Sequence, residues 1–215
     1  MDLLNPVEVR VLSALIEKAV TTPDYYPLSL NALTNACNQS TNRAPVVHYD
    51  EASVAAAIDT LRCKDLVHIV HRKDSRVTRY RHVVDETWGL SPAEIGVMGV
   101  LMLRGPQTVG EIRTRSARLH NFGSLDEVDA GLNALIAREP DALVARLLRQ
   151  SGQKEVRYVH LLAGEFTPEP AESAEGELPP PSSERLSRLE DLTEELQTQL
   201  EDLRQQFEQF RKEFS

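Results

Sequence analysis

Lysine and arginine side chains gather in one segment of the sequence, and their chemistry is that of phosphate binding. Between residues 62 and 82 the chain has seven Lys and Arg residues against two aspartates. Cationic side chains neutralise the phosphates of duplex DNA, so the affinity that they give falls as the salt concentration rises. The segment therefore predicts a nucleic-acid-binding surface, to which we assign Arg72, Lys73, Arg76, Arg79 and Arg81.

A second group of polar side chains lies between residues 38 and 43, and it consists of Asn38, Gln39, Asn42 and Arg43. Amide and guanidinium groups offer paired hydrogen-bond donors and acceptors, which suit the edges of bases or the backbone of a partner. The same side chains also serve inside a fold, where Asn38 would cap the helix before it and Asn42 would hold a turn. The sequence leaves both interpretations open, and the four residues are included in the predicted nucleic-acid-binding surface.

The second half of the chain adds basic residues to this prediction and also carries charges that oppose it. Three arginines are expected on one helix, namely Arg113, Arg115 and Arg118. However, the third predicted helix of each half begins with carboxylates, at Asp50-Glu51 and at Asp126-Glu127. Carboxylates suit the N-terminus of any helix because of the helix dipole. They also repel phosphates, so they oppose the reading of bases by either helix.

Other chemistry has little support in the sequence. His68 and His71, three residues apart on a predicted strand, point to opposite faces and cannot share a metal ion. No Gly-rich phosphate loop, G-x-S-x-G elbow or H-E-x-x-H motif occurs. We expect no metal site, no cofactor and no catalytic residue, and hence a protein that is not an enzyme. The two cysteines, Cys37 and Cys63, are too few for a disulfide framework and are expected to be buried free thiols.

The elements that would position these residues follow a recognisable order. Asn5-Pro6-Val7-Glu8 predicts a helix start with an N-cap, a proline and a capping box. Two further helices are predicted after Ser29 and Asp50, each a good N-cap. In residues 66–84, β-branched side chains flank a polar turn, which predicts a β-hairpin. Three helices followed by a hairpin is the order of a winged helix, so we predict a helix-rich α+β fold.

The same order returns in the second half of the chain. Ser91-Pro92-Ala93-Glu94 repeats the first helix start at an offset of 86 residues. Thr108-Val109 matches Ser29-Leu30 at an offset of 79, and Arg157-Tyr158-Val159-His160 matches Arg79-Tyr80-Arg81-His82 at an offset of 78. Offsets that change only by the length of a loop indicate an internal duplication. We predict two tandem winged-helix (helix-turn-helix) domains, at residues 1–86 and 88–164.

The remaining residues differ in composition from both halves. Residues 165–183 are rich in Pro and Glu and predict a flexible, acidic linker. Residues 184–215 predict a coiled-coil helix, because apolar residues recur there at intervals of three and four. We expect this helix to join two copies of the chain in a homodimer. The residues predicted to form the contact are Leu186, Leu189, Leu196, Leu200, Leu203, Phe207 and Phe210.

The distribution of charge and hydropathy along the chain limits the cellular compartment and the kinds of partner that we expect. The net charge of −9 belongs to residues 165–215, which hold 14 Asp and Glu against 5 Lys and Arg, so the rest of the chain is neutral. A nucleic-acid-binding surface is therefore compatible with the folded part. The N-terminus has no signal-peptide pattern, and the longest apolar run, residues 95–103, is far shorter than a membrane span. We expect a cytoplasmic protein without a membrane partner.

The segment TTPDYYPLSLNALTNACNQSTNRAP, preceded by PVEVRVLSALIEK, resembles the signature of the YceH-like family of uncharacterised bacterial proteins. The resemblance covers residues 1–164. It implies two tandem winged-helix domains and no established biochemical activity. The chain departs from the family pattern at Ser40-Thr41, where Lys-Ser is common, and at Ala44, where Asp is common. If the loop contacts phosphates, the absent lysine weakens that contact here.

Two functions follow as hypotheses. In the first, the protein is DNA-binding or transcription-associated, and the hairpin of residues 66–84 and the loop of residues 38–43 contact the phosphate backbone of duplex DNA. In the second, it is a non-enzymatic adaptor that binds a protein partner, uses its winged helices as a scaffold and assembles through the coiled coil. The first is the leading hypothesis and the second is the alternative, which the carboxylates at the starts of the third helices favour.

Overall fold

Helix α1 (Pro6–Thr21) begins at the predicted capping box. The computed structural model describes residues 2–71, 77–148 and 155–164. The side-chain oxygen of Asn5 accepts hydrogen bonds from the backbone amides of Val7 and Glu8, and the Glu8 carboxylate accepts one from the amide of Asn5. These bonds satisfy amide groups that the first turn of a helix leaves without partners. The predicted helix start is confirmed.

Helices α2 (Leu30–Cys37) and α3 (Glu51–Cys63) also begin at their predicted N-caps, Ser29 and Asp50. Their apolar faces meet α1 in one core, where Leu12, Leu33 and Ile58 are each at most 1% exposed. Burial of a leucine or isoleucine side chain contributes about 1.5–3 kcal/mol. The three helices therefore hold one another in place through the side chains that the helical periodicity predicts.

A three-stranded antiparallel sheet completes the first half. It consists of β1 (Leu28–Ser29), β2 (Val67–Val70) and β3 (Arg79–His82), in the order β1-β3-β2. Strands β2 and β3 form the predicted hairpin, with Ile69 opposite Tyr80. On the other edge of β3, Tyr80 pairs with Leu28 of β1. The sequence does not predict β1, because a strand of two residues is too short to show an alternating pattern.

Short helices join the halves and close turns. A 3₁₀ turn, η1 (Pro23–Tyr25), follows α1, and helix α4 (Val84–Trp88) follows the hairpin. Neither is predicted from the sequence, since each is too short to show helical periodicity. Helix α4 ends at Gly89, whose φ of +58° is the left-handed conformation that glycine adopts without strain.

The second half repeats the order of elements. Helices α5 (Pro92–Arg104), α6 (Val109–Ser116) and α7 (Leu125–Ile136) are followed by strands β4 (Val144–Arg146) and β5 (Tyr158–His160). Ser91 starts α5 with a capping box, as predicted. Thr108 caps α6 as its match to Ser29 predicts, with a capping box in addition, and Ser124 caps α7. The strands pair antiparallel, and an isolated bridge joins Gln107 to Tyr158. This bridge lies where Leu28 meets Tyr80 in the first half.

One side-chain hydrogen bond is also repeated. The guanidinium of Arg79, on β3, donates to the carbonyl oxygen of Pro27 at 2.9 Å. The guanidinium of Arg157, next to β5, donates to the carbonyl oxygen of Pro106, also at 2.9 Å. Arg157 corresponds to Arg79 at the offset of 78 residues found in the sequence. The structure therefore contains the same local arrangement twice.

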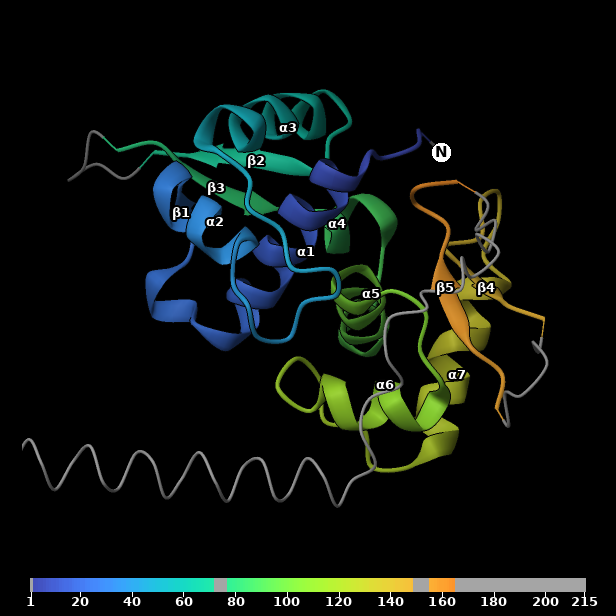
Figure 1. Ribbon diagram of the computed structural model, residues 1–215. Coiled ribbons are helices and arrows are strands. Elements are labelled where there is room, and N and C mark those ends of the chain that lie inside the picture. Colours follow the sequence, from blue (N-terminus) through green and yellow to red (C-terminus); the bar gives the residue numbers. More distant parts are fainter. Residues whose placement is uncertain (1, 72–76, 149–154, 165–215) are drawn as a thin grey trace, which may run out of the picture. The chain divides into compact units, whose positions relative to one another are not determined.

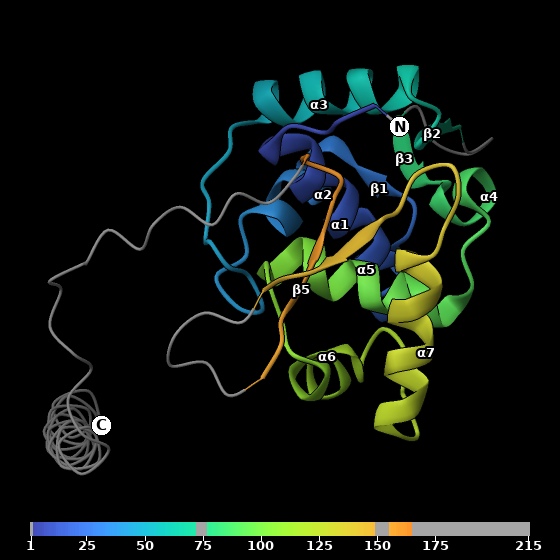
Figure 2. The same cartoon turned by 90° about the vertical axis from the view of Figure 1, so that its right-hand side faces the viewer.

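Helices α1 and α5 pack against each other between the two halves. They lie side by side at the centre of Figures 1 and 2, with α3 toward one edge of the molecule and α6 and α7 toward the opposite edge. A Cβ atom placed on Gly99 of α5 would lie 3.5 Å from the side chain of Ile16 on α1, which shows how closely the helices approach. The described residues all belong to one compact unit.

The helix-rich α+β class that the sequence predicts is confirmed. The division into domains at residues 1–86 and 88–164 stays a prediction. The predicted linker at residues 165–183 and the coiled coil at residues 184–215 lie outside the described residues. Among the helices that the structure describes, none combines the length and the apolar character needed to cross a membrane.

Candidate functional site

Asn38 is the first of the predicted loop residues, and its side chain bonds to backbone of the same loop. Its amide nitrogen donates to the carbonyl oxygen of Tyr49 at 2.7 Å, and its amide oxygen accepts from the Tyr49 backbone at 2.8 Å. Asn38 is also the C-terminal cap of α2, as one of the two interpretations of this residue expects. Both polar atoms of its side chain are therefore engaged in closing the loop of residues 38–50.

Arg43 lies deep in the same loop, with no part of its side chain exposed. Its two terminal nitrogens donate to the two carboxylate oxygens of Glu17 on α1, at 3.1 and 2.6 Å. It also donates to the carbonyl oxygen of Ala36 at 3.0 Å and to the side-chain oxygen of Gln39 at 3.2 Å. Gln39 accepts a further hydrogen bond from Lys18 at 3.3 Å. In this arrangement the Arg43 guanidinium faces the protein and not a phosphate.

Asn42 fixes the loop to the second half of the molecule. Its φ of +60° is the left-handed conformation that asparagine tolerates better than most residues, and its side-chain oxygen accepts a hydrogen bond from Arg104 on α5. The amide of Ala44 donates to the carbonyl oxygen of Leu103 at 2.9 Å. Asn42 thus holds a turn, as its structural interpretation expects, and that turn connects the loop to α5.

Arg10 on α1 also bonds to the backbone at the end of α2 and in the loop of residues 38–50. Its guanidinium donates to the carbonyl oxygens of Cys37, at 3.2 Å, and of Pro45, at 2.6 Å. Burial, and then the neighbouring guanidinium of Arg43, lowers the pKa of Arg10. Sequence reasoning did not identify this residue, because a single arginine on the apolar side of a helix resembles any other surface cation until its burial is seen.

The predicted residues of the first hairpin divide into two sets. Arg72, Lys73 and Arg76 lie outside the described residues. Arg79 bonds to Pro27 as described above, and Arg81 forms an ion pair with Glu86 of α4 at 2.8 Å. The two described arginines are therefore engaged with neighbouring parts of the fold.

The predicted arginines of α6 lie far from that hairpin. Figures 1 and 2 place α6 at the edge of the molecule opposite β2 and β3. Arg113 donates to the carbonyl oxygen of Gly123 at 3.0 Å, and Arg115 donates to the side chain of Gln107. The prediction that Arg118 lies on the same helix is wrong, because α6 ends at Ser116 and Arg118 is exposed in the connection that follows. Among the described residues, the arginines of the first hairpin and those of α6 therefore lie on opposite edges, whereas Arg43 and Arg115 both lie near Arg104 and, after burial, lower its pKa.

The exposed side of α3 carries carboxylates and small side chains. Its one cation, Arg62, pairs with Asp59 at 3.2 Å, and the Glu51 carboxylate accepts a hydrogen bond from Asn31 at 3.1 Å. Hydrogen bonds from Ser53 lower the pKa of the N-cap carboxyl of Asp50. The remaining exposed residues on this side include Ala52 and Ala56. A phosphate backbone lying along α3 would meet negative charge at its N-terminal end.

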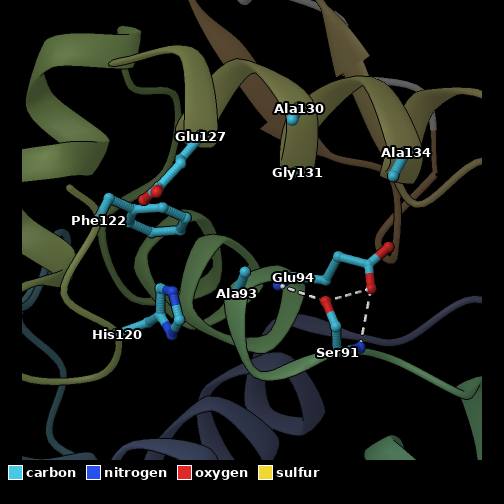
Figure 3. A pocket seen from close by; sticks show the side chains of 9 residues that line it. All are labelled: Ser91, Ala93, Glu94, His120, Phe122, Glu127, Ala130, Gly131 and Ala134. Atoms are coloured by element: carbon cyan, nitrogen blue, oxygen red, sulfur yellow. Dashed lines mark hydrogen bonds between the residues drawn. The ribbon is translucent and has the colours of Figure 1, made fainter. Parts of the chain in front are cut away.

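The corresponding side of α7 borders a pocket with a volume of about 360 Å³ (Figure 3). Small and apolar side chains make most of its wall, and carboxylates of α5 and α7 lie at its margin. Residues from the start of α5, the connection between α6 and α7, and α7 itself line it, namely Ser91, Ala93, Glu94, His120, Phe122, Glu127, Ala130, Gly131 and Ala134.

The connection between α6 and α7 approaches α5 closely and forms one wall of this pocket. A Cβ atom on Gly96 of α5 would lie only 2.7 Å from Cβ of His120, so only glycine fits there without a shift. The rings of His120 and Phe122 meet edge to face with centroids 4.6 Å apart, and Phe122 is 3% exposed. One feature of the sequence pointed to this wall: the connection between α6 and α7 is shorter than the loop of residues 38–50, which occupies the same place between α2 and α3.

Two equivalent histidines lie near the ends of the hairpins. The Nδ1 atoms of His82 on β3 and His160 on β5 are buried, and neither has a hydrogen-bond partner among the described residues, although Nδ1 of His82 lies 3.6 Å from a carboxylate oxygen of Asp85. Burial lowers the pKa of both imidazoles, and that of His160 falls to about 4. His160 is therefore neutral near pH 7 and offers no positive charge to a phosphate.

Both cysteines are free thiols, as expected. Cys37 is buried, and burial raises the pKa of its thiol to about 12. The expectation of burial is wrong for Cys63, which is exposed near the end of α3. The helical face that contains Val54, Ile58 and Leu61 points to the core, and Cys63 lies off that face.

Comparison with known proteins identifies the family. The family model described as "Protein of unknown function, DUF480" matches residues 4–153. The chain is 53% identical to a UPF0502 protein of Geotalea daltonii over 85% of its length and 81% of that protein. It is 48% identical to UPF0502 proteins of Opitutus terrae, over 88% of the chain and 81% of that protein, and of Pelobacter propionicus, over 99% of the chain and 98% of that protein. The predicted family resemblance is confirmed, and the chain belongs to the DUF480 family of bacterial UPF0502 proteins.

Proposed function

We propose that this chain is a tandem winged-helix protein that acts by binding another protein, without enzymatic activity, through the exposed sides of α3 and α7. The order of helix, short strand, two helices and hairpin supports the winged-helix assignment. In the first half β1 pairs with β3, and in the second half the bridge from Gln107 to Tyr158 occupies the same place. The third helix of such a unit is the one that enters a DNA groove in DNA-binding members of this class.

We choose a protein partner over DNA because of the charge on α3 and α7, the third helix of each half. Helix α7 contains three carboxylates, Asp126, Glu127 and Asp129, and no Lys or Arg. The single cation of α3 is paired with Asp59. Like charges brought together across an interface cost several kcal/mol, so these helices are poorly suited to a groove lined by phosphates. Small apolar side chains such as Ala56 and Ala130 instead allow another protein to approach closely.

Site-specific photo-crosslinking in living cells tests this function. A photoreactive amino acid replaces Ala56 on α3 or Ala130 on α7. In the control, the photoreactive amino acid replaces Val20, which is exposed near the end of α1. We expect a discrete adduct with a protein from Ala56, from Ala130 or from both, insensitive to nuclease and absent from the control. Adducts that disappear after nuclease treatment, or no adduct from either helix, would refute the proposal.

The second candidate is binding of duplex DNA through the hairpin of the first half. It is favoured by the residues between β2 and β3, where Arg72, Lys73 and Arg76 stand against the single carboxylate of Asp74. A hairpin of this kind contacts the DNA backbone beside the groove in many winged helices. Such contacts would bind DNA without reading its sequence, and they do not require α3 to enter the groove.

Fluorescence anisotropy with labelled duplexes at several salt concentrations tests this candidate. Replacing Arg72, Lys73 and Arg76 with alanine should weaken binding evenly across DNA sequences. The slope of log affinity against log salt concentration should become shallower by about 1 for each phosphate that the variant no longer neutralises. Arg113→Ala, on the opposite edge of the molecule, is the matched control. An affinity that does not change with salt, or no binding at low salt, would exclude the candidate.

A further inference from the structure

The pocket beside α7 combines an apolar wall with an acidic margin. Phe122, Ala130 and Ala134 line it, and the carboxylates of Glu94 and Glu127 lie at opposite ends (Figure 3). Its volume of about 360 Å³ is near the lower limit of pockets that hold small molecules, which is roughly 300 Å³. It is large enough for one bulky side chain of a partner.

The two carboxylates of the pocket each accept hydrogen bonds from a neighbouring part of this chain. The Glu94 carboxylate accepts from the amide of Ser91 at 2.8 Å and from its hydroxyl at 2.6 Å. One oxygen of Glu127 accepts from the amide of Gly123 at 2.7 Å. A small-molecule site needs several polar groups that converge on the ligand. This pocket instead offers an apolar surface and net negative charge, which fits an anchoring side chain of a protein.

The negative charge is not neutralised within the described part of the chain. Oε1 of Glu127 forms no hydrogen bond there, and the described ion pairs of this region include none with Glu94 or Glu127. Arg113 of α6 donates to the carbonyl oxygen of Gly123 and not to Glu127. A partner that brings a cation next to its apolar side chain would therefore find carboxylates without an ionic partner.

We propose that this pocket receives a basic amphipathic helix of a partner protein, which inserts one large apolar side chain and places Lys or Arg beside Glu127 and Glu94. The inference rests on the proposed function and specifies the chemistry of the partner. The pocket belongs to the second half: its walls include His120 and Phe122, from the short connection that takes the place of the polar loop of residues 38–50.

The test uses the full chain and three labelled synthetic helical peptides. One is composed of leucine and lysine, one of leucine and glutamate with the same apolar face, and one of lysine and serine without leucine. We expect only the leucine and lysine peptide to bind, as measured by fluorescence anisotropy, and to shift the NMR signals of Ala130 and Ala134. Equal binding of the leucine and glutamate peptide, or no binding of any of the three, would overturn the proposal.

Substitutions in the pocket separate its two features. Ala130→Trp fills the pocket and should weaken binding of the leucine and lysine peptide about tenfold or more. Val20→Trp, at the exposed position near the end of α1 that also serves as the crosslinking control, is the control here and should leave it unchanged. Glu127→Gln keeps an oxygen for the Gly123 amide but removes the charge, so it should weaken binding several-fold and reduce its dependence on salt. Binding that neither Ala130→Trp nor Glu127→Gln affects would refute the pocket as the site.

The outcome can be distinguished from a failure of the proposed function. If the peptide does not bind while a photoreactive residue at Ala130 still joins a protein in cells, the inferred chemistry of the partner is wrong and the protein-binding function stands. If the adducts from Ala56 and Ala130 are nuclease-sensitive, the proposed function itself fails. Circular dichroism of each variant verifies that a loss of binding does not come from unfolding.

Discussion

The Nη2 atom of Arg43 lies 2.6 Å from Oε2 of Glu17, in a pair whose arginine side chain is completely buried. The residues are 26 positions apart in the chain, and their contact fixes the loop of residues 38–50 to α1. A buried guanidinium that loses its carboxylate has no water to replace it. The pair is therefore needed for stability even where its net contribution, relative to two apolar residues, is small.

Glu17→Gln should lower the free energy of unfolding by about 3 kcal/mol or more, because it leaves the Arg43 charge buried without a counterion. Urea denaturation followed by circular dichroism measures the change. The matched control is Asp59→Asn, which removes one partner of an exposed pair with Arg62 and should change stability by less than about 1 kcal/mol. Equal losses for the two variants would show that the buried pair has no special role.

Gly96→Ala should destabilise the protein, because the added methyl group would lie 2.7 Å from Cβ of His120. The overpacking costs about 1–3 kcal/mol, more than the gain in helix propensity of up to about 1 kcal/mol. Gly110→Ala on α6 is the control, since outside its own turn of the helix no described atom lies within 4 Å of its Cβ position. It should be neutral or slightly stabilising in thermal unfolding. A stable Gly96→Ala variant would contradict the close approach of α5 and the α6–α7 connection.

Protonation of His160 should make stability depend on pH. Its folded-state pKa of about 4 lies below the ordinary value near 6.5, so the imidazole contributes no pH dependence above about pH 6.5. As the pH falls below that value the unfolded chain takes up a proton that the folded protein does not, and stability falls by about 2 kcal/mol by pH 5. The same direction holds for His82.

Urea denaturation at pH 7.5 and pH 5.0 checks this expectation. His160→Phe replaces an imidazole whose Nδ1 has no hydrogen-bond partner and should reduce the difference between the two pH values. His48→Phe, at an exposed position, should leave the difference unchanged. If His160→Phe keeps the full pH dependence, other groups are responsible for it.

The predicted coiled coil can be tested by light scattering. The full chain should be a dimer, and Leu196→Asp together with Leu203→Asp should convert it to a monomer, because charges in the apolar contact oppose association. Thr198→Asp lies outside the predicted contact and should leave the dimer intact. A wild-type chain that is monomeric at micromolar concentration would refute the prediction.

The helix starts could be predicted because their determinants are local. Asn5, Ser29 and Ser91 each cap a helix through contacts within three residues, and a pattern of that length is visible in the sequence. The two-residue strand β1 could not be predicted, because it exists only through pairing with β3, about 50 residues later in the chain. Short elements of this kind depend on tertiary contacts.

In the candidate site, too, local features could be predicted and those that depend on tertiary contacts could not. The sequence identified Asn38 and Asn42 as unusual but could not choose between a partner and the protein's own backbone, since both use the same hydrogen-bonding groups. The partners of Arg43 and Asn42, Glu17 and Arg104, come from distant helices and have no signal in the loop. The pocket beside α7 was missed because it arises from the fit of Gly96 against His120.

The packing of α1 against α5 also sets the geometry of recognition. Since both helices belong to one compact unit, packed helices and not a flexible tether connect the exposed side of α3 to that of α7. A partner that contacts both sides gains from bivalent attachment only if its own contact points match that span, because a rigid spacer gives a high effective concentration at one distance and almost none at others. The molecule would then discriminate among partners by length as well as by chemistry.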